Sequence, residues 1–282
     1  MPAVLTSHAY GKSRVRLTRV TRRPGRHEVR ELTVDVRLEG DFAASYTLGD
    51  NSKVIATDTM KNVVYALAQG RPAEAIEDFA AVVAGHFVES HNHVESAAVS
   101  VSERPWRRIE IEGAESPHAF VGGDGEARTT RVRRDRSGLR IDSGLEGMQV
   151  LKTAGSGFVG FLRDGYTTLP EVTDRIFATE VQGRWLYAAA ARPDWDGAHR
   201  RIRTALLATF AAHPSLSVQQ TLHAMGEAAL AACAEVEEIT LTLPNKHRLL
   251  VDLSQFGREN ANEVFVATEE PFGLITGTLR RA

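Results

Sequence analysis

Each half of this 282-residue chain has strand-like segments, then two helix-like segments, then more strands. In the first half, apolar residues alternate with polar ones along residues 32–38, which is the spacing of a half-buried strand, and helical patterns follow at 59–69 and 73–87. In the second half, helical patterns occur at 196–212 and 217–233. This order predicts an α+β protein of two tandem units, each an antiparallel sheet with two helices on one face.

The predicted boundary between the units is Asp124-Gly125, which makes them residues 1–125 and 126–282. The net charge of -2 gives no reason to expect nucleic-acid or membrane partners. No apolar run approaches the roughly 20 residues that span a bilayer. The single cysteine excludes an intrachain disulfide and any site built on clustered thiolates. We therefore expect a cytoplasmic protein.

Two segments point to other kinds of site. His91 and His93 would share one face of a strand and could contact one metal ion, but we see no further cluster of ligands and favour a polar strand start. Residues 128–140 contain six arginines, which suggests a nucleic-acid surface. Because aromatic residues are not interleaved with these arginines, a solvated hairpin is the better interpretation.

Three stretches remain that composition does not explain: residues 10–12 with 54–62, residues 151–175, and residues 217–221 with 243–247. Each has a structural explanation. Thr57 or Asp58 could cap the helix that starts near Thr59. Phe158 could anchor a loop to the core together with Phe161. Asn245 could be a turn residue after Pro244.

Taken together, the order, spacing and identity of these residues resemble the urate oxidase (uricase) family. The most specific segment runs from Lys152 to Arg175, and the next is Leu-Pro-Asn-Lys-His at 243–247. The resemblance implies two tandem T-fold units per chain and a homotetramer around a tunnel. The terminal sequence TLRRA lacks a peroxisomal signal, so a bacterial-type member is expected.

The resemblance also implies catalytic roles. Lys12 and Thr57 are similar to the catalytic pair of the family, and His247 joins them through a proton relay. Asn245 and Thr57 are similar to the site that holds oxygen or water above the substrate plane. A lysine can act as a base only in its neutral form, which desolvation or nearby cations favour.

The substrate-binding roles follow in the same way. Arg175 and Gln219 resemble the clamp on urate, and Phe158 resembles the ring that stacks on it. Arginine offers a planar fork to an anionic edge, and glutamine offers both a donor and an acceptor. The family's remaining contacts correspond to the backbone N–H groups of Asp58 and Val218 and the side chain of Leu169.

The implied reaction oxidises urate with O2 and water to 5-hydroxyisourate and hydrogen peroxide, without a cofactor. Deprotonated urate is itself the reductant, so no metal or flavin is needed. In the family the site lies between subunits, so Thr57 and Asp58 would face Arg175 and Gln219 of a neighbour. Two alternatives stay open: another T-fold enzyme acting on a pterin-like or purine-like heterocycle, and a urate-binding protein without turnover.

Overall fold

The computed structural model describes residues 3–71, 74–123, 125–268 and 270–282 and divides into two compact units. The first unit comprises Met1–Gly144 and Leu186–Asp196, and the second comprises Leu145–Trp185 and Gly197–Ala282. Asp124 of the predicted boundary and residue 73, where the second helical pattern begins, lie outside the described residues. The repeat boundary therefore stays a prediction.

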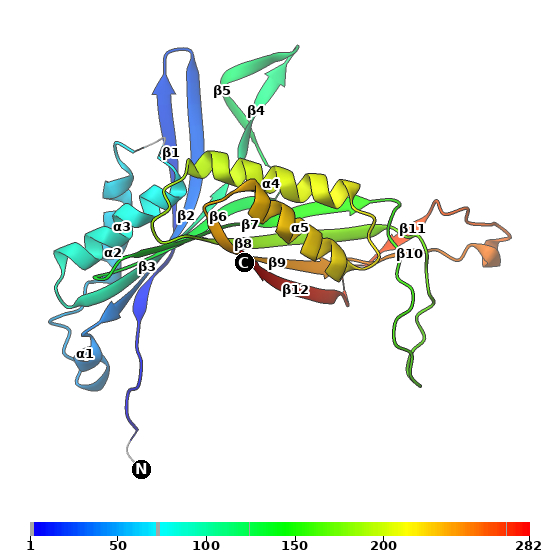
Figure 1. The fold of residues 1–282 in the computed structure, drawn as a ribbon. Helices are drawn as coiled ribbons and strands as arrows, with labels where there is room; N and C mark the ends of the chain where they lie inside the picture. The colour runs from blue at the N-terminus through cyan, green and yellow to red at the C-terminus, as the bar shows by residue number, and fades with distance from the viewer. Residues whose placement is uncertain (1–2, 72–73, 124, 269) are drawn as a thin grey trace. The chain divides into compact units, whose positions relative to one another are not determined.

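The first unit is an antiparallel sheet with helices packed on it (Figure 1). Its strands follow the order β1-β2-β3-β6, and the start of β7 (Leu139–Lys152) lies beside β6. The four complete strands are β1 (Tyr10–Arg23), β2 (Arg26–Gly40), β3 (Val94–Arg104) and β6 (Ala127–Asp135). The helices are α1 (Ala43–Thr47), α2 (Thr57–Ala68) and α3 (Ile76–Ser90), and a separate hairpin consists of β4 (Trp106–Ile111) and β5 (Ala114–Gly122).

The apolar periodicity explains how this unit packs. Leu32, Val34, Val36 and Leu38 are at most 2% exposed, because alternate residues of a strand face the same side. Helix α3 packs against β3 and β6 with its buried face. The residues of this face were predicted from the helical spacing and are buried: Ile76, Phe79, Ala80, Val83 and Phe87.

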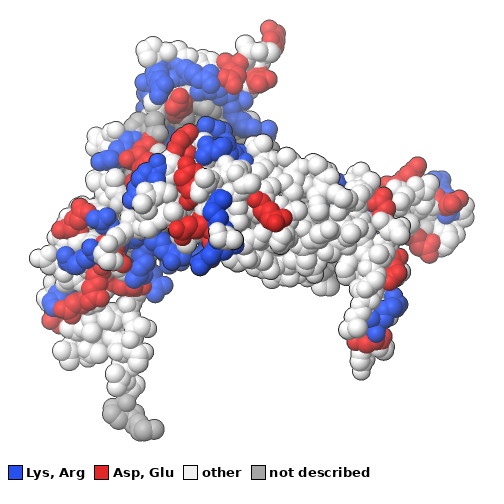
Figure 2. Space-filling view, viewed as in Figure 1, with Lys and Arg blue, Asp and Glu red and all other residues white. Residues whose placement is uncertain are grey.

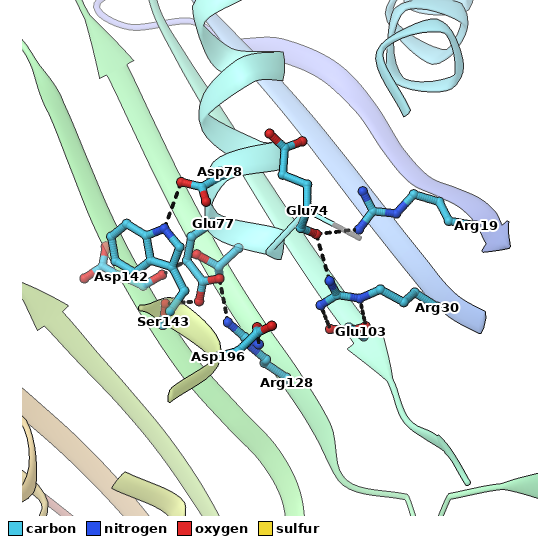
Figure 3. Close-up of polar contacts among 12 residues, drawn as sticks. Arg19, Arg30, Glu74, Glu77, Asp78, Glu103, Arg128, Asp142, Ser143 and Asp196 are labelled. Carbon is cyan, nitrogen blue, oxygen red and sulfur yellow. Dashed lines mark hydrogen bonds and ion pairs between the residues drawn. The ribbon is translucent and has the colours of Figure 1, made fainter. Parts of the chain in front are cut away.

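A buried ion pair ties the start of α3 to the sheet (Figure 3). Glu77 is fully buried, and its carboxylate accepts hydrogen bonds from Arg128 of β6 at 2.7 Å and from the Ser143 hydroxyl at 2.5 Å. Arg128 also pairs with Asp196. Burial alone would lower the pKa of Arg128, but the two carboxylates raise it. Breaking such a pair leaves a buried charge uncompensated, which is costly.

Two further arginines hold the segment before α3 (Figure 3). Arg19 of β1 donates to the carbonyls of Arg71 and Glu74 at 2.7 and 2.9 Å, and its guanidinium lies over the Phe79 ring. Arg30 of β2 donates to the Glu74 carbonyl and pairs with Glu103. Charged side chains from the sheet therefore fix the end of the α2–α3 connection.

The second unit has the strand order β7-β8-β9-β12, with helices α4 and α5 (Figure 1). The elements are β8 (Phe177–Tyr187), α4 (Trp195–Ala212), α5 (Val218–Ala232), β9 (Val236–Asn245), β10 (Arg248–Leu250), the 3₁₀ turn η1 (Ser254–Phe256), β11 (Phe265–Ala267) and β12 (Gly273–Arg280). Helix α5 packs on β9 and β12. Ile239, Leu241 and Leu243 of β9 are fully buried, as their alternation predicts.

The structure corrects several details of the sequence interpretation. Helix α2 begins at Thr57, not near Thr59, and its N-cap is Ala56. Neither Thr57 nor Asp58 is therefore the cap, and that structural explanation is wrong. The short helix α1 was not predicted, because five residues carry too little periodicity to detect.

Candidate active site

Lys12 lies at an irregularity in β1. The register with β2 shifts between Lys12 and Val15, so one extra residue enters the strand. Arg14 in this bulge has φ 58°, and its N–H donates to the Asp35 carboxylate at 2.9 Å. A Cβ at Gly11 would lie 1.8 Å from the Val36 carbonyl oxygen, so only glycine fits beside β2. Strand bulges redirect neighbouring side chains, and this one lies directly after Lys12.

Thr57 and Asp58 are the first two residues of α2, and both are exposed. The Tyr10 hydroxyl accepts the Ile55 N–H at 2.8 Å and so ties the chain entering α2 to β1. Lys61 holds the pKa of the Asp58 carboxyl below its usual range, and the Lys12 charge adds to the effect. The structure therefore brings Lys12 near the start of α2, within one unit.

The loop at 153–175 is anchored to the segment preceding α5. Gly157 donates to the Ser215 carbonyl at 2.8 Å, and Ser215 donates to that of Gly155 at 2.9 Å. The Arg175 N–H donates to the Ser156 carbonyl at 2.6 Å. These backbone bonds close the base of the loop, although residues 153–175 contain no regular helix or strand, as predicted.

The same anchoring brings two candidate residues together at the base of the loop. The guanidinium carbon of Arg175 lies 5.4 Å from the centroid of the Phe158 ring. Phe158 and Val172 exchange two backbone hydrogen bonds across the loop, at 2.7 and 3.2 Å. Burial lowers the pKa of Arg175, and no carboxylate among the described residues acts on it. Burial, with a contribution from the Arg175 charge, also lowers the pKa of His247.

The remaining candidates lie on the ends of regular elements. Val218 and Gln219 are the first two residues of α5, behind the N-cap Ser217. The first N–H groups of a helix have no partner within it, so the backbone of Val218, like that of Asp58 in α2, can donate to a ligand. Asn245 ends β9 opposite Gly273. Leu169 lies in the loop and is 48% exposed.

The histidine pair does not have the geometry expected for it. His91 ends α3 and His93 lies in the turn before β3, so the two do not alternate along a strand. Their rings meet edge to face with centroids 5.9 Å apart. Across the part of the chain that the structure describes, no group of three or more histidine, cysteine, aspartate or glutamate side chains is placed to hold a metal ion.

Several arginines of the arginine-rich segment are paired with carboxylates. Arg133 contacts Glu39 at 2.9 Å and Arg134 contacts Glu89 at 3.3 Å. On the face drawn in Figure 2, basic and acidic side chains are interspersed. No described helix is both long and apolar enough to cross a membrane.

Sequence reasoning gave no role to three residues that support the candidates. Tyr10 bonds to Ile55, far along the chain, and Arg163 bonds to Leu169 across the loop. Ser215 bonds to the backbone of the distant loop at 153–175. Tyr10 and Arg163 lie inside the stretches that composition did not explain, which was the available signal. Ser215 had none.

In the described part of the chain, the base of one loop of this α+β fold carries an aromatic ring beside a half-buried guanidinium that has no carboxylate partner, an arrangement that can bind a planar anion. A model of the uricase family matches residues 8–133 and 141–276. The uricase of Arthrobacter globiformis is 44% identical over 278 residues, 99% of this chain and 90% of that protein. The uricase of Oryctolagus cuniculus is 38% identical over 278 residues, which are 96% of this chain and 93% of that protein.

The crystal structure of the Arthrobacter globiformis uricase superposes with a TM-score of 0.94 at 44% identity, covering 100% of this chain and 96% of that one. The crystal structure of a Bacillus sp. TB-90 urate oxidase superposes with a TM-score of 0.86 at 26% identity, covering 97% of this chain and 100% of that one. The chain belongs to the uricase family. The predicted family and T-fold are confirmed, and neither alternative function is favoured.

Proposed function

We propose that this chain oxidises urate with O2 and water to 5-hydroxyisourate and hydrogen peroxide. Two electrons pass from urate to oxygen, and the atoms of one water and one O2 are divided between the two products. Membership of the uricase family supports the reaction. The assignment of individual residues rests on their contacts, beginning with Arg175.

The environment of the Arg175 guanidinium is the observation that carries the proposal. Arg19, Arg30 and Arg128 each bond to backbone carbonyls or carboxylates. Arg175 is half-buried, and within the described residues burial is the only resolved influence on its pKa. A desolvated guanidinium without an acidic partner attracts an anion strongly. The adjacent Phe158 ring suits a flat one, and Gln219 adds a donor and an acceptor.

Proton removal falls to Lys12, Thr57 and His247 in this proposal. Positioned acid–base groups must be held within hydrogen-bond reach of the proton they move. The β1 bulge beside Lys12 and the Tyr10–Ile55 hydrogen bond before Thr57 support such a role for these two residues. The lowered pKa of His247 keeps its imidazole neutral near pH 7, so that it can accept a proton. Asn245 and Thr57 would hold oxygen or water above the ring.

The proposed assembly is a homotetramer with sites at subunit interfaces. Thr57 and Asp58 of one subunit would then face Arg175 and Gln219 of another. The likeness to uricases over the full chain supports a shared architecture. The cytoplasmic location stays a prediction.

The direct test mixes protein stripped of metal by chelation with urate in air, and follows urate absorbance and peroxide. We expect one peroxide for each urate consumed, at the rate of untreated protein. Activity that disappears on chelation and returns only with copper, iron or zinc would overturn the cofactor-independent reaction.

A complementation test addresses the shared site. Inactive Thr57→Ala and Arg175→Ala chains are refolded together, and subunit mixing is verified with two tags. Mixed assemblies should contain some interfaces with both defects and some with neither, and the latter should be active. Verified mixing without recovered activity would place both groups in one chain's pocket.

A further inference from the structure

The side chains at the middle of the loop form a stack behind Phe158. The rings of Phe158 and Phe161 are stacked, with centroids 4.8 Å apart and planes 10° from parallel. The guanidinium carbon of Arg163 lies 5.6 Å from the centroid of the Phe161 ring. Arg175 lies against Phe158. Each of the two stacked rings therefore has an arginine guanidinium close to it.

The backbone of the loop is shaped to allow this stack. Gly160, between the two phenylalanines, has φ 70°, a left-handed conformation that favours glycine. Its N–H donates to the Glu171 carboxylate at 2.9 Å, which bonds the turn to the returning side of the loop. Both rings are half-buried, whereas Leu162 and Tyr166 in the same loop are 91% and 94% exposed.

Arg163 also reaches the other loop residue assigned to the substrate. Its Nη1 donates to the Leu169 carbonyl at 3.2 Å. The same guanidinium thus contacts the ring behind Phe158 and the backbone of Leu169. A single side chain couples the two loop positions that would touch urate.

We propose that Phe161 and Arg163 are positioning residues that set the plane of the Phe158 ring and the place of Leu169 for the stacked substrate. The proposal rests on the proposed function. A phenyl ring on a loop without regular structure would otherwise change rotamer freely, and substrate binding would have to order it. The stack orders Phe158 before the substrate arrives. Its effect is expected on substrate binding, because the two residues contact Phe158 and Leu169, which are assigned to binding.

The test compares Phe161→Leu and Arg163→Met with wild-type protein. Steady-state turnover gives KM and kcat, and calorimetry with urate in the absence of oxygen gives the binding constant. We expect KM and Kd to rise by roughly three- to tenfold, from the usual strengths of aromatic pairs and cation–π contacts, with kcat within about twofold. Phe161→Tyr and Arg163→Lys keep a ring and a cation, and should recover most of the affinity.

Controls separate positioning from folding. Arg258→Met changes an exposed arginine of the same unit in the same way and should leave KM and the melting temperature unchanged. If Phe161 acts through Phe158, then Phe161→Leu should have no further effect on KM in a Phe158→Leu background.

Wild-type affinity in both Phe161→Leu and Arg163→Met would overturn the proposal. A fall in kcat as large as the rise in KM, together with a lower melting temperature, would also overturn it. Additive effects of Phe158→Leu and Phe161→Leu would overturn it too. Wild-type protein that leaves urate unchanged would instead overturn the proposed function and this inference together. The two failures are therefore distinguishable.

Discussion

The two units hold their candidate residues in different ways. In the first unit, Lys12 lies in a strand and Thr57 starts a helix, and the neighbouring α3 is fixed by the buried Glu77–Arg128 pair. In the second, Phe158 and Arg175 lie on a long loop held by backbone bonds at its base. Proton transfer requires tight geometry, which regular elements provide, whereas ring binding tolerates a loop on a rigid scaffold. Changes to Lys12 and Thr57 should therefore lower kcat, and changes to Phe158 and Arg175 should raise KM.

The largest expected effect is that of Lys12→Met. We expect kcat to fall by roughly 10²–10⁴-fold with a much smaller change in KM, because a positioned acid–base group is removed. Adding Thr57→Ala should cost far less than the product of the two single effects, since residues of one relay are non-additive. Lys53→Met, at an exposed ion pair, is the control. A raised KM at unchanged kcat would assign Lys12 to binding instead.

The next effect concerns stability in the first unit. Arg128→Met leaves the fully buried Glu77 carboxylate without its cation, and should lower the free energy of unfolding by about 3 kcal/mol or more. Urea denaturation measures this change. Arg131→Met alters an exposed arginine of the same strand and should cost less than about 0.5 kcal/mol. Equal losses in the two variants would mean that the pair does not anchor α3.

A smaller effect is expected from Arg175→Lys in the second unit. The charge is kept but the planar fork is lost, which should weaken urate binding by about 2 kcal/mol, or roughly thirtyfold in Kd. The change should appear in KM rather than in kcat. Arg184→Lys, at an exposed position of β8, serves as the matched control. An unchanged KM would show that Arg175 has a structural role, and the contrast between the units would fail.

The smallest effect is a pH dependence at His247. Burial and then the Arg175 charge lower its pKa below the usual value of about 6.5. As pH falls below about 6.5, the imidazole of His247 is protonated in the unfolded chain before it is protonated in the folded chain. The free energy of unfolding therefore decreases until the pH falls below the folded-state pKa of His247. Arg175→Met removes one cause and should raise the pKa of His247. NMR titration of the imidazole measures this pKa, and identical titrations of the two proteins would contradict an effect of the Arg175 charge on His247.

Most of the regular structure could be predicted from local pattern. Residues 32–38 and the buried face of α3 follow from spacing alone, because burial of one face imposes a period on the sequence. The candidate site was reached through resemblance, since its residues are scattered from Lys12 to His247. The start of α2 was missed because its N-cap is Ala56, which is not a capping residue type.

The sequence by itself determined the α+β class, the order of elements and the family, because these depend on periodicity and on residues that keep their spacing. Only the tertiary structure decided that Glu77 meets Arg128, that the strand bulges at Lys12 and that Phe161 stacks on Phe158. It also left Arg175 without an acidic partner among the described residues, whereas Arg30 and Arg128 are paired with carboxylates. Such pairings form between groups that are distant in the sequence and are buried together, where an unpaired charge would be costly. The local sequence pattern does not show which groups these are.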